Sequence, residues 1–126
     1  MKYIITDRRC GLGDAILNLA ASWYIAREYG CGVIIDWRRL PYTLKDEKTF
    51  ERHHLNLYNS IYKLPDPIDG VSFHFPEEFP EVFLGPKTDD GHPYDLDNFP
   101  CIEQDEENVE NIISHIKNST FIRNTM

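Results

Sequence analysis

The fold is decided by Tyr3–Arg39, which reads YIITDRRCGLGDAILNLAASWYIAREYGCGVIIDWRR. An apolar, β-branched run over Lys2–Thr6 predicts a buried strand. A glycine-containing turn over Asp7–Gly13 follows, and then a long apolar helix from Asp14 to about Tyr29. Gly30 and Gly32 are expected to end that helix, because its left-handed C-terminal position favours glycine. A second strand over Val33–Trp37 completes a β-α-β unit, so we predict an α/β, Rossmann-like parallel sheet flanked by helices.

Composition places the chain among ordinary globular proteins. The 126 residues suit one domain, 1–126, and 41% of them are hydrophobic. The net charge of −8 argues against general nucleic-acid binding, and no apolar stretch is long enough to span a membrane. Three cysteines without a C-x-x-C pair fit a reducing compartment, and the first residues do not resemble a signal peptide, so we predict a cytoplasmic protein.

The polar positions of the long helix form one narrow stripe of Asp14, Asn18 and Ser22, spaced four residues apart. Almost every other position is apolar or alanine, whereas a helix with its back in water shows a wide charged face. We therefore expect this helix to be covered on more than one side, by another layer of the domain or by a partner domain.

Further elements are predicted along the rest of the chain. A short helix is possible between Phe50 and Ile61, where apolar residues recur at helical spacing. Alternation predicts a third strand over Val71–Phe75, and residues from about 76 to 104 are expected to form a long irregular loop, rich in acids and prolines. A second helix is expected over Asp105–Lys117 and the start of a fourth strand over Thr120–Arg123.

Basic residues follow the first two strands. Arg8 and Arg9 lie beside the turn, and Arg38 and Arg39 follow the second strand. Residues 1–63 hold ten Lys/Arg against seven Asp/Glu, a balance of +3, whereas residues 64–126 hold three against fourteen, a balance of −11. Ligands of open α/β sheets bind outside the carboxyl ends of the strands, so we predict a cationic, anion-binding site there. Its predicted residues are Arg8, Arg9, Gly11, Leu12, Gly13, Asp14, Asp36 and Arg38.

The glycine turn departs from the common nucleotide-binding motifs. Gly11-Leu12-Gly13 sits between strand and helix, where free amides can meet an anion. Ile16 occupies the third glycine position of the dinucleotide fingerprint, which disfavours NAD even though Asp36 falls at the ribose-binding spacing. No phosphate-binding loop of the Walker type occurs.

Other potential chemistry is weaker. Asp95-Leu96-Asp97 has the D-x-D pattern with which some sugar transferases bind a divalent metal, but in this acidic loop we interpret the two carboxylates as solvent-exposed charges. His53 and His54 have no further His or Cys at a spacing typical of metal ligands. His74 alternates with the strand apolars and is expected on the opposite face. We predict no metal and no resident cofactor, and the residues alone identify no catalytic group.

Three short patterns then suggest a family: R-R-x-G-L-G-D, L-A-A-x-W-x-x-A and G-x-x-x-x-x-D-W-R. They resemble the start of bacterial nodulation-type fucosyltransferases, of the alpha-1,6- and protein-O-fucosyltransferase superfamily. The likeness covers Tyr3–Tyr42 and fades near Asp66–Val71. Its positions are Arg8, Arg9, Gly11, Gly13, Asp14, Leu19, Ala20, Ala21, Trp23, Ala26, Gly30, Asp36, Trp37, Arg38 and Tyr42.

The resemblance implies the N-terminal, acceptor-side domain of a metal-independent GT-B glycosyltransferase that uses GDP-fucose or a similar nucleotide sugar and a glycan acceptor. In that family a second, C-terminal domain carries most of the nucleotide site and an arginine-rich catalytic motif, which this chain is too short to contain. Two interpretations stay open. The chain is half of a transferase that needs a second domain or subunit, or it is a stand-alone, non-catalytic domain whose ligand is an anion, a glycan or a partner protein.

Overall fold

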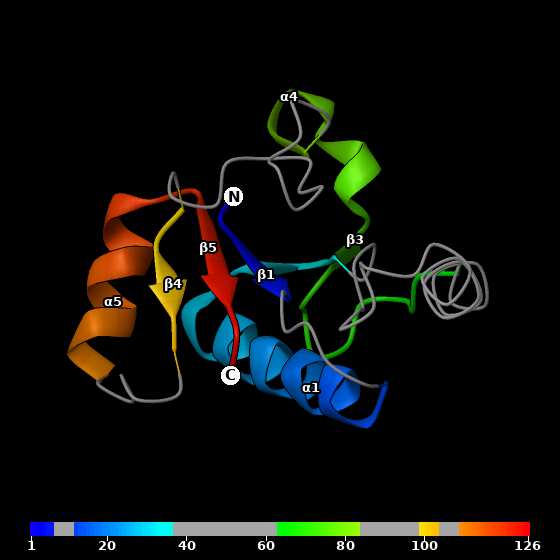
Figure 1. Cartoon of the computed structure of the whole chain (residues 1–126), viewed down its shortest axis with the longest axis horizontal. Helices are drawn as coiled ribbons and strands as arrows, with labels where there is room; N and C mark the ends of the chain where they lie inside the picture. Colours follow the sequence, from blue (N-terminus) through cyan, green and yellow to red (C-terminus); the bar gives the residue numbers. More distant parts are fainter. Residues whose placement is uncertain (7–11, 37–62, 84–98, 104–108) are drawn as a thin grey trace, which may run out of the picture.

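Five parallel strands form the sheet of this protein. The computed structural model describes residues 1–6, 12–36, 63–83, 99–103 and 109–126. The strands stand in the order β3-β2-β1-β5-β4, and every pair of neighbours is parallel. This confirms the predicted α/β, Rossmann-like fold (Figure 1). The strands are β1 (Tyr3–Thr6), β2 (Gly32–Ile35), β3 (Phe73–His74), β4 (Cys101–Ile102) and β5 (Phe121–Asn124).

The first β-α-β unit is confirmed with small shifts of its boundaries. Strands β1 and β2 pair directly, and helix α1 (Leu12–Tyr29) connects them. The helix begins two residues before the predicted Asp14, so Leu12 and Gly13 are helical rather than part of the turn. It ends as predicted at Gly30, whose φ is +71°, and the Cys31 N–H closes the last turn on the Ala26 carbonyl at 2.9 Å.

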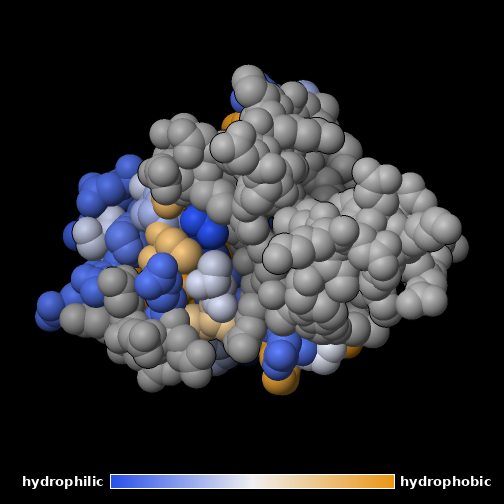
Figure 2. All heavy atoms as spheres, viewed as in Figure 1, coloured by the Kyte–Doolittle hydropathy of each residue, from blue (hydrophilic) through white to orange (hydrophobic). Residues whose placement is uncertain are grey.

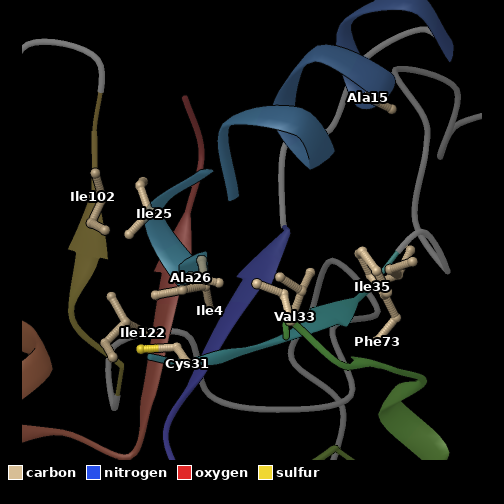
Figure 3. Close-up of a cluster of buried hydrophobic side chains, with 11 residues drawn as sticks. Ile4, Ala15, Ile25, Ala26, Cys31, Val33, Ile35, Phe73, Ile102 and Ile122 are labelled. Carbon is tan, nitrogen blue, oxygen red and sulfur yellow. The ribbon is translucent and has the colours of Figure 1, made fainter. Parts of the chain in front are cut away.

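The larger core lies between the sheet and its two long helices, α1 and α5 (Val109–Asn118). Ile4, Val33 and Ile122 project from three adjacent strands, and Ile25 and Ala26 of α1 pack against them (Figure 3). Ile112 and Ile116 bring the apolar face of α5 to the same cluster. β-Branched residues suit these positions because they fill the pleated surface of a buried strand.

The opposite face of the sheet carries a smaller, aromatic core. Ile5 and Ile34 are fully buried there. Tyr3 stacks on Phe121 with ring centroids 5.7 Å apart, and Phe79 meets Tyr3 edge-on at 4.8 Å. Phe79 lies between two short helices, η2 (Pro76–Glu78) and α4 (Pro80–Phe83), which cover this face.

The predicted irregular loop from 76 to 104 is therefore wrong in part. It contains η2, α4 and strand β4, and residues 84–98 and 104–108 lie outside the described part. The prolines predicted irregular structure, but Pro76 and Pro80 are each the first residue of a short helix. Proline is tolerated there because the first amides of a helix have no hydrogen-bond partner within it. The predicted helix between Phe50 and Ile61 also falls outside the described residues.

The buried side of α1 combines polar side chains with the apolar Ala15, Ile25 and Ala26. Asn18 and Ser22 are buried against the sheet, at 1% and 0% exposure. Ile16, Leu17 and Tyr24 point outward and remain 50%, 67% and 55% exposed. Asp14, the third residue of the polar stripe, is exposed, and the described residues form no second layer over the outward side of α1, so the expectation that the helix is covered on more than one side stays a prediction.

Candidate functional site

The strands change from apolar to polar where they reach the carboxyl edge of the sheet. Thr6 is the last residue of β1, Asn124 the last of β5, and Asp36 directly follows β2. All three are buried, at 0%, 0% and 8% exposure. Together with Asn18 and Ser22 they make up all the buried polar residues of the described chain. Burying polar groups is costly unless they are bonded, so this concentration at one edge marks a specialised region.

A hydrogen-bond network joins α1 to the end of β5. The Asn18 amide nitrogen donates to two backbone carbonyls, that of Asn124 at 2.9 Å and that of Met126 at 2.5 Å. The Asn124 amide donates to Ser22 Oγ at 2.9 Å, and Ser22 Oγ donates to the Asn18 carbonyl at 2.9 Å. The Met126 N–H donates to Asn124 Oδ1 at 3.1 Å. The network we call the Asn clamp (Asn18, Ser22, Asn124 and the Met126 backbone) therefore fixes the carboxyl end of β5 against the helix.

A second polar contact joins β1 and β2 at the same edge. The Asp36 N–H donates to Thr6 Oγ1 at 3.3 Å. Thr6 is in register with Ile35 on one side and Asn124 on the other, so it lies between Asp36 and the Asn clamp. Three strands thus end in a continuous row of buried polar groups whose hydrogen bonds fix the shape of this edge.

The first turn of α1 begins beside this row. Gly13 is exposed, and a Cβ placed on it would meet nothing within 4 Å. Asp14 is exposed in the first helical turn, where a carboxylate interacts favourably with the positive end of the helix. Among the predicted site residues, the structure thus brings Leu12, Gly13, Asp14 and Asp36 to the carboxyl edge.

The structure does not describe the arginines predicted for this site. Arg8, Arg9, Gly11 and Arg38 fall outside the described residues, so the positive charge of the site stays a prediction. The described part of the edge contributes the carboxylates of Asp14 and Asp36.

Sequence reasoning missed Asn18, Ser22, Thr6 and Asn124. The stripe of polar residues in α1 was recognised, but its direction was not. The available signal was that both helix positions are uncharged hydrogen-bonding residues in an otherwise apolar helix. Amide and hydroxyl groups can be buried at acceptable cost when bonded, whereas a solvent-facing stripe usually carries charges.

A separate hydrogen-bonded chain lies on the aromatic face. Ser72 Oγ is 2.8 Å from His74 Nε2, and His74 Nδ1 is 3.3 Å from Glu78 Oε1. The second carboxylate oxygen of Glu78 accepts the Phe75 N–H at 2.7 Å. His74 therefore points away from buried Phe73, as alternation predicted, and the chain of contacts fixes the turn from β3 into η2.

Thiolate or metal chemistry finds little support in the described part. Burial raises the pKa of the Cys31 thiol, partly offset by Lys2, so the thiol stays protonated at neutral pH. Within the residues that the structure describes, no three His, Cys, Asp or Glu side chains gather to hold a metal ion. In the same ranges no helix is long and apolar enough to cross a membrane.

Comparison with known proteins identifies the family. The profile of Nodulation protein Z (NodZ) matches residues 1–88. Nodulation protein Z of Azorhizobium caulinodans is 32% identical over 72 residues, which cover 57% of this chain and 20% of that protein. Its counterpart in Bradyrhizobium diazoefficiens is 40% identical over 37 residues, 29% of this chain and 10% of that protein. No solved structure gives a significant match.

The family match covers the N-terminal part of the described fold. The chain spans a fifth or less of the length of these two relatives. The matched residues include α1 and three of the five described strands, β1, β2 and β3, with the part of the carboxyl edge that Thr6 and Asp36 form, whereas Asn124 of β5 lies outside the match. The profile covers more than two thirds of the chain, and the chain belongs to the Nodulation protein Z (NodZ) family.

Proposed function

We propose that this chain is the acceptor-side half of a fucosyltransferase-like glycosyltransferase. A second domain or subunit would hold most of the nucleotide sugar, of the GDP-fucose kind, and the completed enzyme would transfer the sugar to a glycan hydroxyl with inversion. The observation that carries the proposal is the family match over residues 1–88, which include Thr6, Asp36 and the start of α1 at the carboxyl edge. The region in question holds the R-R-x-G-L-G-D and D-W-R patterns.

The chemistry of the edge supports this role. The carboxylates of Asp36, at the end of β2, and of the exposed Asp14 are suited to accept hydrogen bonds from sugar hydroxyls, and the buried Thr6 and Asn124 hold the strand ends of this edge in place. Cationic Arg8, Arg9 and Arg38, predicted to follow the same strands, would stabilise negative charge on the departing diphosphate. We assign this edge the role of binding and orienting the acceptor.

The anion site is tested by titration. Sulfate or GDP is expected to shift the backbone amide resonances of residues 9–15 more than any others, because helix-start amides and nearby arginines attract anions. Charge reversal by Arg9→Glu or Arg38→Glu is expected to abolish the response while the remaining spectrum stays folded. Shifts confined to residues 76–100, with an unchanged glycine turn, would place the site elsewhere.

The division of labour is tested by assay. Residues 1–126, purified alone, are expected not to transfer fucose from GDP-fucose to a chitooligosaccharide or an N-glycan core, because in our proposal the nucleotide site belongs to a second domain or subunit. Saturable binding of an acceptor glycan without turnover is expected in the same samples by calorimetry. Turnover by the pure chain, lost on Arg9→Glu substitution, would refute the proposal that a second half is required.

A further inference from the structure

A hydroxyl, an imidazole and a carboxylate follow one another in direct contact on the aromatic face. Ser72 Oγ lies 2.8 Å from His74 Nε2, and His74 Nδ1 lies 3.3 Å from Glu78 Oε1. A nucleophile within hydrogen-bond reach of a base, with the base oriented by a third group, is the geometric signature of covalent catalysis. We call these three side chains the Ser72 triad.

One arrangement of protons satisfies every contact of the Ser72 triad. The Glu78 carboxylate can only accept, so the His74 Nδ1–H donates to it, and His74 Nε2 is left to accept the Ser72 hydroxyl. Met1 Sδ is a second neighbour of Ser72 Oγ at 4.0 Å, but a thioether is a weak acceptor and the imidazole contact is far shorter. The hydroxyl proton therefore points at a base, as nucleophilic attack by serine requires.

Backbone contacts hold each member of the triad in place. The Ser72 carbonyl accepts the Val33 N–H at 2.9 Å, and His74 belongs to β3, which pairs with β2. Glu78 Oε2 accepts the Phe75 N–H at 2.7 Å. The start of η2 is thus held by Oε2 alone, whereas the contact between Oε1 and His74 serves to orient the imidazole.

Gly32 leaves room for the serine hydroxyl. A Cβ at this position would lie 3.0 Å from Ser72 Oγ and 3.0 Å from the Tyr3 ring, so one of the two would have to move. The absence of a side chain on β2 therefore lets Ser72 Oγ lie where it reaches His74.

The surroundings of the triad indicate the kind of molecule that fits. The rings of Tyr3 and Phe79 meet the His74 ring edge-on, with centroids 5.2 and 5.8 Å away. Ser72 is half-buried, and the side chains of His74 and Glu78 are 21% and 47% exposed, so the triad is open to solvent. Aromatic walls favour a small molecule with an apolar group, and the Glu78 carboxylate disfavours anions.

We propose that Ser72 is a nucleophile that takes the acyl group of a small, neutral carboxylic ester. Ser72 Oγ attacks the carbonyl carbon while His74 Nε2 takes the hydroxyl proton. The ester C–O bond then breaks, and the departing oxygen receives that proton and leaves as the alcohol. Water attacks the acyl-serine with help from the same base, which releases the carboxylic acid and restores the hydroxyl. Glu78 acts through His74 and is a positioning residue.

This reaction is independent of the proposed transferase function. The Ser72 triad shares no residue with the carboxyl edge, and it needs no nucleotide sugar and no second domain. Loss of either activity would therefore leave the other unchanged.

Labelling with a fluorophosphonate tests the nucleophile, because a serine activated by a base displaces the fluoride and keeps the phosphonyl group. Residues 1–126 are expected to gain one group, located on Ser72 by peptide mass spectrometry. p-Nitrophenyl acetate is expected to leave an acetyl group on the same residue in an acid-quenched sample. Ser114, an exposed serine of α5, where Figure 2 shows a mostly hydrophilic surface, is the internal control and is expected to stay unlabelled.

A variant without the base tests the mechanism. His74→Gln keeps a hydrogen-bonding side chain that cannot take the proton, and it is expected to slow labelling at least about 100-fold. His115→Gln, the same change in α5, is expected to leave the rate unchanged. Circular dichroism checks that both variants are folded. A folded wild-type chain without an adduct on Ser72, or an adduct that forms as fast in His74→Gln, overturns the proposal.

The positioning role of Glu78 has its own readout. Glu78→Gln keeps a side chain able to cap η2, and it is expected to slow labelling at least about tenfold while the urea midpoint stays the same. Nitrogen NMR shifts of the His74 ring are expected to show the Nδ1–H tautomer in the wild type and to lose this preference in the variant. An unchanged rate together with an unchanged tautomer would overturn the role of Glu78.

Discussion

Replacing Asn18 by aspartate is expected to lower the free energy of unfolding by about 3–5 kcal/mol at neutral pH. The new carboxylate has the same shape but no proton to donate. It would face the carbonyl oxygens of Asn124 and Met126, which now accept from the Asn18 amide at 2.9 and 2.5 Å. A protein of this size has roughly 5–15 kcal/mol of stability in total, so the variant is expected to lose a large part of it.

The pH dependence gives this prediction a distinctive form. Burial beside carbonyl oxygens raises the pKa of the new carboxyl in the folded state, because only the protonated form can donate. The folded protein then binds the proton more tightly than the unfolded one, so the variant is most stable in acid and loses stability as pH rises. Urea unfolding at several pH values measures this. Asn111→Asp, the same change at an exposed position of α5, is the control and is expected to change stability by less than about 0.5 kcal/mol. Equal effects of the two variants would disprove the role of the Asn clamp.

Truncation of Ile4 to alanine is expected to cost about 2–5 kcal/mol. Ile4 is fully buried in the central strand β1, where β2 and β5 flank it and α1 and α5 cover its face. Little of the resulting cavity can close, because the strands on both sides are fixed by hydrogen bonds. The midpoint of urea unfolding reports the loss.

An exposed apolar residue provides the matched control for that truncation. Val109→Ala removes methyl groups from a position that is 59% exposed and is expected to change stability by less than about 0.5 kcal/mol. An Ile4→Ala protein as stable as the Val109→Ala protein would contradict the assignment of Ile4 to the core.

Local sequence signals were sufficient for the first β-α-β unit. β-Branched runs predicted β1 and β2, and Gly30 predicted the end of α1, since each of these features depends on neighbouring residues only. The family likeness was also local, because it rests on motifs within the first forty-two residues. The profile match over residues 1–88 confirms it.

Long-range partners were not predictable in the same way. Strand β4 has two residues, too few for alternation to be recognised, and exists because β5 pairs with it. The burial of Asn18 depends on its hydrogen bond to Asn124, which is 106 residues away along the chain. Ile25 and Ala26 turn α1 toward the sheet as hydrophobic periodicity predicts, and the hydrogen bonds to β5 allow Asn18 and Ser22 to be buried beside them.

The Asn clamp also has a consequence for the order in which the protein acquires its structure during synthesis. Helix α1 and strands β1 and β2 leave the ribosome long before Asn124 does. Until then Asn18 lacks the carbonyls, and Ser22 the Asn124 amide, that β5 and the residues after it later supply. The early chain can already pack Ile25 and Ala26 of α1 against Ile4 and Val33, but the same side of the helix then carries polar groups without their final partners. We therefore expect ribosome-bound chains that end before Phe121 to hold α1 less firmly against β1 and β2.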